Sequence, residues 1–307
     1  MRLARHGSLA RLAWPGRLAV LAGLAVAVGL LGLAGCGSSG GSGSGSGSQG
    51  AGDTSVRATA LPRPVACASC QRLPIKESWD IQLSTTPTAP YPDVGLIELD
   101  GFDTSAATLT ALHRSRAGRV VVCYIDAGTW ESWRPDAKQY PKSLLGKPYV
   151  SWPGERWVNI TQYRGTLGTI LRSRVQMCRS KGFDAVDFDN VDEYANDSGF
   201  TLTAANQLAF NTFLANLAHR AGLLVALKND PGQIPQLLPY FDFAVDEQCY
   251  QGGGGGCGLD RFIRAGKPAF DIEYQGPASK FCPAANRAGV NTILKQLSLN
   301  AWRVACR

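Results

Sequence analysis

The sequence predicts one (β/α)8 barrel, the TIM barrel fold, on three observations. Apolar strand-like runs recur along the chain, helical stretches separate several of them, and polar residues collect where the runs end. The carboxyl ends of parallel barrel strands form one rim, which holds the chemistry of such folds. The eight predicted strands are Trp79–Leu83, Val94–Leu99, Arg119–Ile125, Ala185–Asp189, Leu223–Lys228, Phe241–Glu247, Pro268–Glu273 and Thr292–Leu297.

Helical stretches are predicted between several strands, among them Ala106–Arg116, Thr166–Lys181 and Thr203–Ala221. Thr203, with Gln207 downstream and an apolar run behind it, predicts a capped helix start. Trp157–Ile160 is a ninth strand-like run, and we place it in a long insertion after the third strand.

The N-terminal residues predict export and anchoring. Residues 1–35 combine a basic start with an apolar run that ends at Leu33-Ala34-Gly35-Cys36. This pattern resembles the lipobox of bacterial lipoproteins, which implies cleavage before Cys36 and a diacylated thiol. An uncleaved membrane anchor is the alternative. Residues 36–60 form a Gly/Ser-rich tether, and residues 61–307 form the single folded domain. We expect this domain at the outer face of the cytoplasmic membrane, lipid-anchored or released from the cell.

Charge and histidine content narrow the function classes. The formal net charge is +7, but residues 1–35 carry four arginines and no acid, so removing them leaves +3. There is no basic run or RNA-binding motif, so we expect no nucleic-acid partner. Three scattered histidines do not make a metal cluster, and we expect neither a metal nor an organic cofactor.

Eight cysteines remain beyond Cys36, an even number that predicts disulfides in an oxidising compartment. Cys249–Cys257 would close a glycine-rich loop. Cys123–Cys178 would join a strand to the helix that covers it. Cys282–Cys306 and Cys67–Cys70 follow by elimination.

The stretch from Lys181 to Asp192 carries the strongest functional signal. Side chains alternate along a strand, so Asp187 and Asp189 share one face while Val186 and Phe188 take the other. Two acids aimed into a barrel are more than a buried strand needs. Asp187 is expected one layer deeper, and Asp189 at the mouth.

Polar residues at the ends of this and other strands are expected to orient substrate around Asp189 and its catalytic partner: Asp126, Asp187, Asn190, Lys228, Asp230 and Glu273. Capping of a following helix is the competing interpretation for Asp103 and Asp230. Lys228 at a strand end could form a Schiff base, but an ion pair with the surrounding carboxylates is the favoured interpretation.

Two facing carboxylates without metal ligands are the equipment for cleaving a glycosidic bond, and Asp189 and Glu247 are the candidates. Neighbouring acids crowd Asp189, whereas Phe243 and Val245 give the strand before Glu247 an apolar inner face, which would favour a protonated acid. The sequence has no Gly-x-Ser-x-Gly elbow, no P-loop and no Gly-x-Gly-x-x-Gly that opens a helix.

Aromatic residues near the strand ends suit a sugar substrate, because flat rings can stack on sugar faces, although ordinary packing is the alternative. An acidic rim on a net basic chain favours a cationic polymer, such as one with free amino sugars. The aromatic candidates for substrate contact are Tyr124, Trp130 and Tyr274.

Several motifs, in order, closely resemble the endo-α-1,4-polygalactosaminidase family of glycoside hydrolases: Leu99–Asp103, Val122–Gly128, Gly182–Val191, Leu227–Asp230 and Glu247–Cys249. The resemblance runs from about Trp79 to Trp302. It implies a TIM barrel that cleaves galactosamine-containing polysaccharide, with Asp189 as nucleophile and Glu247 as acid/base. A different amino or neutral polysaccharide, or a barrel that only binds polysaccharide, are the alternatives. The sequence leaves the stereochemistry and the natural polymer open.

Overall fold

The computed structural model describes residues 61–307, so the predicted signal peptide, Cys36 and the tether lie outside the described residues. Eight parallel strands form the main sheet, in the order β1-β2-β3-β7-β8-β9-β10-β11. Their bounds are β1 Trp79–Gln82, β2 Leu96–Asp100, β3 Val120–Asp126, β7 Ala185–Asp189, β8 Leu224–Lys228, β9 Phe243–Glu247, β10 Ala269–Glu273 and β11 Asn291–Lys295. The predicted fold class is confirmed, and each predicted strand is present with its ends shifted by at most two residues.

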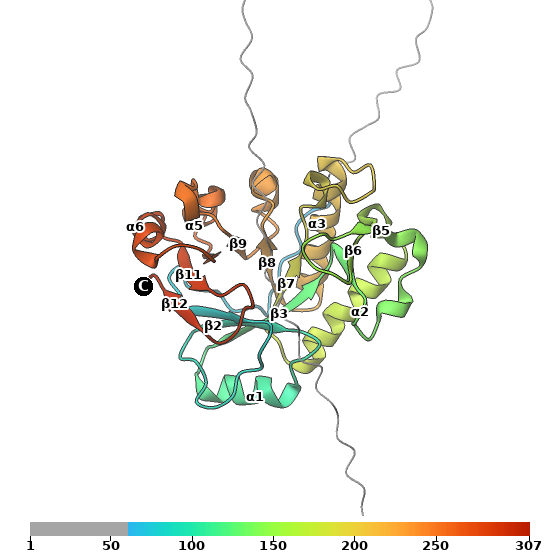
Figure 1. The fold of residues 1–307 in the computed structure, drawn as a ribbon. Coiled ribbons are helices and arrows are strands. Elements are labelled where there is room, and N and C mark those ends of the chain that lie inside the picture. The colour runs from blue at the N-terminus through green and yellow to red at the C-terminus, as the bar shows by residue number, and fades with distance from the viewer. Residues whose placement is uncertain (1–60) are drawn as a thin grey trace, which may run out of the picture. The chain divides into compact units, whose positions relative to one another are not determined.

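Helices surround the outside of this sheet (Figure 1). They are α1 Ala106–Ser115, α2 Thr166–Lys181, α3 Ala204–Arg220, α4 Ile234–Leu237, α5 Asp260–Arg264 and α6 Ala278–Ala288. Short 3-10 turns span Ala137–Gln139, Lys142–Leu144, Ile160–Gln162, Glu193–Ala195, Pro231–Gln233, Gln251–Gly253 and Gly256–Gly258. Within the described residues no helix joins β1 to β2, because residues 83–95 contain three prolines that cannot continue a helical ladder. No helix among residues 61–307 is long and apolar enough to cross a membrane.

The predicted cap at the start of α3 is present, and its second residue is Asn206 and not Gln207. Thr203 caps the helix as predicted, but the reciprocal bond comes from Asn206, whose side chain accepts from the Thr203 backbone. Gln207 is instead buried and binds Asn211. The capping box thus uses the third residue of the helix, which is the usual geometry.

Two apolar layers hold the barrel together. The inner layer lies inside the sheet and includes Trp79, Phe243 and Phe270, whose rings pack against one another. The outer layer fills the space between the sheet and the helices. Inward and outward side chains alternate along each strand, so this division decides which polar residues can reach the rim of the barrel.

A short C-terminal strand closes the seam between β11 and β1, and the sequence did not predict it. β12 (Arg303–Ala305) runs antiparallel to β11. The guanidinium of Arg303 donates to the carbonyl of Trp79 at 2.7 Å, and the amide of Leu83 donates to Leu299 at 2.9 Å. The barrel is therefore nearly closed, with the chain end between its last and first parallel strands.

The insertion after β3 forms a three-stranded antiparallel sheet in the order β4-β6-β5. Its strands are β4 Thr129–Glu131, β5 Leu145–Pro148 and β6 Glu155–Val158. The predicted run Trp157–Ile160 lies in this insertion, as expected, but the strand begins and ends two residues earlier.

All four predicted disulfides are present: Cys67–Cys70, Cys123–Cys178, Cys249–Cys257 and Cys282–Cys306. Cys123–Cys178 joins β3 to α2 and is fully buried. It closes a loop with a sequence separation of 55, whereas Cys67 and Cys70 are separated by only three.

Replacing both Cys123 and Cys178 by Ala is expected to lower the free energy of unfolding by roughly 2–5 kcal/mol. The long loop gives the unfolded chain more freedom once it is opened, and two buried sulfurs are lost. Urea unfolding measures the change. The double replacement of Cys67 and Cys70 is the control, and an equal loss in both variants would contradict the dependence on loop length.

Candidate active site

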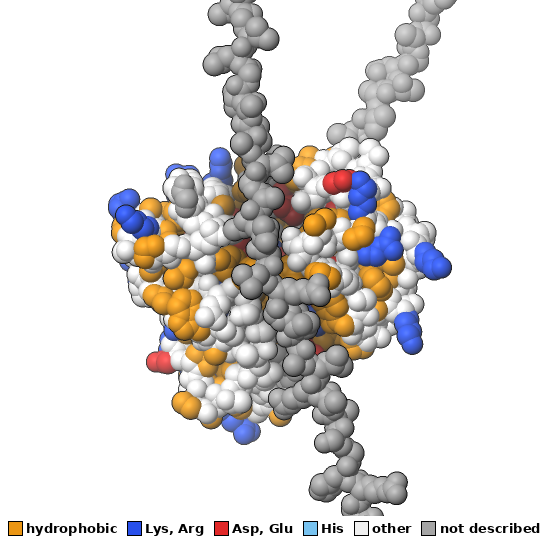
Figure 2. Space-filling view, viewed as in Figure 1, with side chains coloured by type: hydrophobic (Ala, Val, Ile, Leu, Met, Phe, Trp, Pro, Cys, Tyr) orange, Lys and Arg blue, Asp and Glu red, His pale blue; other side chains and the backbone are white. Residues whose placement is uncertain are grey.

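The strand register brings the predicted acids to one rim. Asp126 at the end of β3 is level with Asp189 at the end of β7, and Tyr124 is level with Asp187. Val245 and Ala226 belong to the inner layer, and alternation therefore turns Glu247 and Lys228 inward. Figure 2 shows Asp and Glu side chains in a hollow near the centre of the viewed face, while many Lys and Arg side chains lie around its edge.

Lys228 joins the two predicted catalytic carboxylates. Its ammonium lies 3.3 Å from Asp189 Oδ1 and 2.8 Å from Glu247 Oε2. The lysine side chain is 5% exposed, whereas those of Asp189 and Glu247 are 20% and 29% exposed. The favoured prediction for Lys228, an ion pair with carboxylates, matches these contacts. The cation lies beneath the two acids, and the acids themselves remain open to a ligand.

Each of the two carboxylates forms a hydrogen bond with a tyrosine hydroxyl. The hydroxyl of Tyr124 donates to Asp189 Oδ2 at 2.7 Å, and the hydroxyl of Tyr274 bonds to Glu247 Oε1. Burial raises the pKa of both phenols well above the ordinary value, and the charges of Asp189 and Glu247 raise it further. The two tyrosines therefore stay neutral and hold the carboxylates in fixed orientations.

Asp189 has the surroundings of an ionised acid. Burial alone would raise its pKa, but the Lys228 ammonium, the Tyr124 hydroxyl and the Asn190 amide outweigh burial and lower the pKa. Burial alone would lower the pKa of Lys228, but the charges of Asp189 and Glu247 outweigh burial and raise the pKa well above its ordinary value. At neutral pH this part of the site therefore contains a carboxylate and an ammonium.

Glu247 does not end in the apolar surroundings that its strand suggested. Phe243 and Val245 do face the inner layer, as predicted. The carboxyl group, however, reaches past them and ends between Lys228 and Tyr274. Strand alternation predicts the direction of a side chain but does not show what its far end touches.

Asp187 lies one layer below Asp189, as expected, and is fully buried with Glu98 of β2 beside it. Burial raises the pKa of Asp187 to about 7, against the opposing effect of Lys228. Burial and the charge of Asp187 raise the pKa of Glu98 well above its ordinary value. These two carboxyls therefore retain a proton between them near neutrality. Because Asp187 has no exposed surface, it supports the site from below and does not touch a ligand.

Asp126 holds the side chain of Asn190 in place beside Asp189 through a hydrogen bond. Asp126 is buried and accepts from the side-chain amide of Asn190 at 2.6 Å and from Thr129 Oγ1 at 2.6 Å. Burial, followed by the charge of Asp189, raises the pKa of Asp126 well above its ordinary value. Gly128 permits the close approach of this loop, since a Cβ there would lie 1.7 Å from the Asn190 carbonyl oxygen.

The residue after each central side chain has a left-handed backbone. The angle φ is 59° at Asn190, 50° at Asn229 and 61° at Gln248. Residues other than glycine seldom adopt this conformation, and it concentrates at functional sites. Here it turns the chain away from the strand directly after Asp189, Lys228 and Glu247.

Three predicted contact residues lie elsewhere. Glu273 belongs to the outer face of β10 and accepts from the amides of Tyr250 and Gln251 at 2.6 and 3.0 Å. Asp230 is buried against Asn211, 2.9 Å from its amide, and does not cap a helix with its side chain. Trp130 donates to the carbonyl of Ala137 at 3.0 Å and packs on the outer core. Each is a structural group in this arrangement.

Tyr149, from the insertion, is a site residue that the sequence did not suggest. Burial and the charge of Asp189 raise the pKa of its hydroxyl to about 12. Its ring packs edge-on against Trp157, with centroids 4.9 Å apart. Because the insertion is a separate sheet, no strand-end pattern marks this residue.

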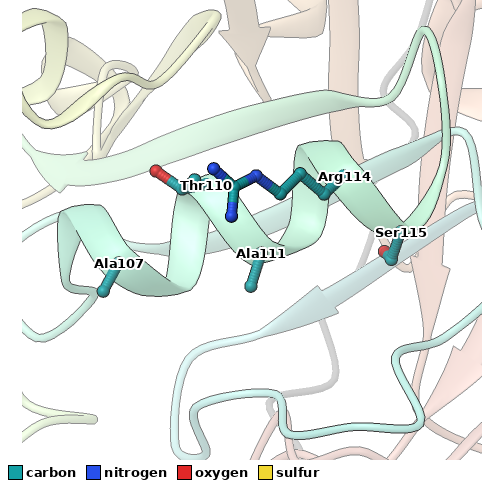
Figure 3. Close-up of a pocket in the computed structure, with 5 residues that line it drawn as sticks. All are labelled: Ala107, Thr110, Ala111, Arg114 and Ser115. Atoms are coloured by element: carbon teal, nitrogen blue, oxygen red, sulfur yellow. The ribbon is translucent and has the colours of Figure 1, made fainter.

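Two other places in the described residues resemble sites but lack the parts for catalysis. Asp246, Cys249 and Cys257 form a close group of ligand types, but the two sulfurs are bonded to each other and offer no thiolate. A surface depression of about 530 Å³ lies along one face of α1 and is lined by Ala107, Thr110, Ala111, Arg114 and Ser115 (Figure 3). It has no carboxylate and its residues belong to one helix, so it lacks the parts of a catalytic site.

Glu193 provides a test of the buried acids near the site. It is fully buried, and burial raises its pKa to about 9. The folded state therefore holds this proton more tightly than the unfolded state does. Its stabilising contribution is complete below the unfolded pKa of about 4.3 and is lost as the pH rises through about 9.

Thermal unfolding of the protein is accordingly expected at lower temperature at about pH 9 than at about pH 5. Glu193→Gln, which cannot ionise, should reduce this slope. Asp197→Asn, an exposed rim carboxylate, is the control and should leave the slope unchanged. A Glu193→Gln slope equal to that of the unmodified chain would contradict the assignment.

A (β/α)8 barrel with two accessible carboxylates at its rim has the architecture of a glycoside hydrolase. The comparison with known families agrees: residues 59–307 match the model of glycoside-hydrolase family GH114. The chain belongs to this family and is a glycoside hydrolase. The family resemblance seen in the sequence motifs is confirmed.

Two solved structures place the chain among similar proteins. Aspergillus fumigatus Ega3, in complex with galactosamine, is 35% identical with a TM-score of 0.72, covering 80% of this chain and 99% of that chain. The glycoside hydrolase domain of PelA from Pseudomonas aeruginosa is 14% identical with a TM-score of 0.59, covering 75% of this chain and 99% of that chain. The second likeness shows the shared fold. No match was found among curated proteins.

Proposed function

We propose that this protein is an endo-glycosidase that hydrolyses α-1,4-linked, galactosamine-containing exopolysaccharide with a pair of carboxylates. The observation that carries the proposal is the placement of Asp189 and Glu247 on either side of Lys228, both open to the hollow. The similarity to a galactosamine-bound structure supports the sugar class. The acids of the hollow suit protonated amino groups on the polymer.

In the proposed reaction, Asp189 attacks the anomeric carbon while the bond to the leaving oxygen breaks. Glu247, in its protonated form, gives its proton to that oxygen. The resulting carboxylate of Glu247 then takes a proton from water, which attacks the anomeric carbon and releases Asp189. The ionised state that the surroundings give Asp189 suits the nucleophile role.

The separation of the two acids favours retention of configuration. Asp189 Oδ1 and Glu247 Oε2 contact the same nitrogen, at 3.3 and 2.8 Å. These two oxygens are therefore no more than about 6 Å apart, which suits the roughly 5–5.5 Å between the carboxyl groups of a retaining pair better than the roughly 6.5–9.5 Å of an inverting pair. Tyr124 and Tyr274 hold the acids at this spacing.

We further propose that the protein is a lipoprotein at the outer face of the cytoplasmic membrane, anchored through Cys36. The basic and apolar segment before Cys36 supports this location, as do four disulfides in the described domain. Incorporation of a labelled fatty acid into the chain, and its loss in Cys36→Ala, is the measurement. Equal labelling of both chains would contradict the anchor.

The full chain, solubilised in detergent, is incubated with α-1,4-linked galactosamine polymer and separately with chitosan, and new reducing ends are counted. We expect release from the first polymer, with oligomers rather than single sugars as the early products. Release from chitosan alone would discard the substrate class. Binding without release from either polymer would show a carbohydrate-binding protein without activity.

A further inference from the structure

The insertion presents an exposed apolar surface beside the hollow. Trp133, Val150 and Trp152 are 51%, 95% and 38% exposed, and we call these three residues the insertion platform. Tryptophan has a large flat ring, and grouped exposed apolar side chains are more informative than single ones. In Figure 2, apolar side chains lie over the region of β5 and β6.

Backbone contacts fix the platform in place. The turn after β5 is closed by bonds from the Trp152 amide to Tyr149 and from the Glu155 amide to Trp152, at 3.2 and 3.1 Å. The ring of Trp133 lies against Gly154, where a Cβ would be 3.0 Å from the ring. Gly154 has a φ of +100°, so both its backbone and its lack of a side chain suit this contact. The rings are presented on a defined surface.

The platform is continuous with the active site through the same turn. Tyr149 begins the turn, its ring packs against Trp157 with centroids 4.9 Å apart, and Trp157 pairs with Thr129 across the insertion sheet. At the base of the insertion, Thr129 Oγ1 contacts Asp126 at 2.6 Å and Glu155 at 3.0 Å. A polymer that extended from the acids over Tyr149 would reach Trp152 of the same turn next.

The charges of the platform differ from those of the hollow. Within residues 127–160, the acids Glu131 and Glu155 are buried, and Asp136 is mostly buried in an ion pair with Arg174. The exposed charged side chains in this range are Lys138, Lys142, Lys147 and Arg156, of which Lys147 pairs with the exposed Asp197. Such a surface stacks a sugar ring but repels an ammonium group, whereas the hollow attracts one. The two neighbouring surfaces are thus suited to sugars of different charge.

We propose that the insertion platform is a second carbohydrate subsite that binds uncharged sugar units of the polymer, namely N-acetylated ones, while free amino sugars occupy the hollow. This inference rests on the proposed function for the identity of the polymer. A second exposed group, Leu297, Trp302 and Val304, lies at the same rim beside the carboxyl end of β11, on the other side of Glu247 from the insertion.

The test measures binding separately from cleavage. The full chain carrying Glu247→Gln is titrated with α-1,4-linked galactosamine oligomers, either free or re-acetylated with acetic anhydride. Adding Trp133→Ala and Trp152→Ala is expected to weaken binding of the acetylated oligomer on the order of tenfold, because two stacking rings are lost. Binding of the free-amine oligomer should change less than about twofold.

Ile75→Ala, at 37% exposure and before β1 at the opposite end of the barrel, is the control and should leave both affinities unchanged. Unchanged melting temperatures show that the variants are folded, and Trp152→Phe should retain part of the affinity. Equal losses for both oligomers, no loss for either, or the same loss in Ile75→Ala would overturn the proposal. Failure of the proposed function would be seen in the separate cleavage assay, in which the unmodified protein would release no reducing ends from the polymer.

Discussion

Replacing Asp189 with Asn is expected to lower kcat on the polymer by roughly 10³-fold or more, because the amide cannot form the bond to the anomeric carbon. The change keeps the size of the side chain and its bond from Tyr124. It removes the charge that neutralises Lys228 from one side. Counting reducing ends at saturating polymer, with the melting temperature measured alongside, separates lost chemistry from lost folding.

The control for this variant is Asp197→Asn. Asp197 is an acid with an 81% exposed side chain, and it pairs with Lys147 of the insertion. It should keep kcat within about twofold, since exposed ion pairs contribute little. If Asp189→Asn kept more than a tenth of the activity, Asp189 would not be the nucleophile.

Replacing Glu247 with Gln is expected to lower kcat on the polymer by about 10²–10⁴-fold, since the leaving oxygen no longer receives a proton. An aryl glycoside with an acidic phenol leaves without that proton, so its first step should be affected much less. Added azide should restore turnover of this substrate by attacking the glycosyl–enzyme bond without a base.

Glu77→Gln is the matched control for this experiment, because Glu77 precedes β1 at the opposite end of the barrel. It should leave both substrates unaffected. A Glu247→Gln variant that lost the polymer and the aryl glycoside equally, with no effect of azide, would assign Glu247 a role in binding and not in proton transfer.

The sequence predicted the barrel and the positions of Asp189 and Glu247 at its rim, because both depend on local patterns. Apolar runs predicted the strands, and strand alternation turned Asp187 and Asp189 inward. The parallel topology then brings the end of β7 near the end of β9, so Asp189 and Glu247 meet without any sequence signal for the contact. Their link through Lys228 could be anticipated only as an ion pair with unspecified acids.

Strand alternation also predicts that Glu273 does not face the site. Phe270 and Ile272 face the inner layer, so alternation places Glu273 on the outer face and Tyr274 on the inner one. An acid at a strand end is therefore a site candidate only when strand alternation turns its side chain toward the inside of the barrel. Tyr149 could not be found in this way, because its position depends on how the insertion folds back over the rim.

The seam at Arg303 and Trp79 has a consequence for how the protein is made. The two residues are 224 positions apart, so this contact forms only after Arg303 has been synthesised. Until then the growing chain keeps this edge of β1 without its partner, so the first parallel strand is among the last to be closed.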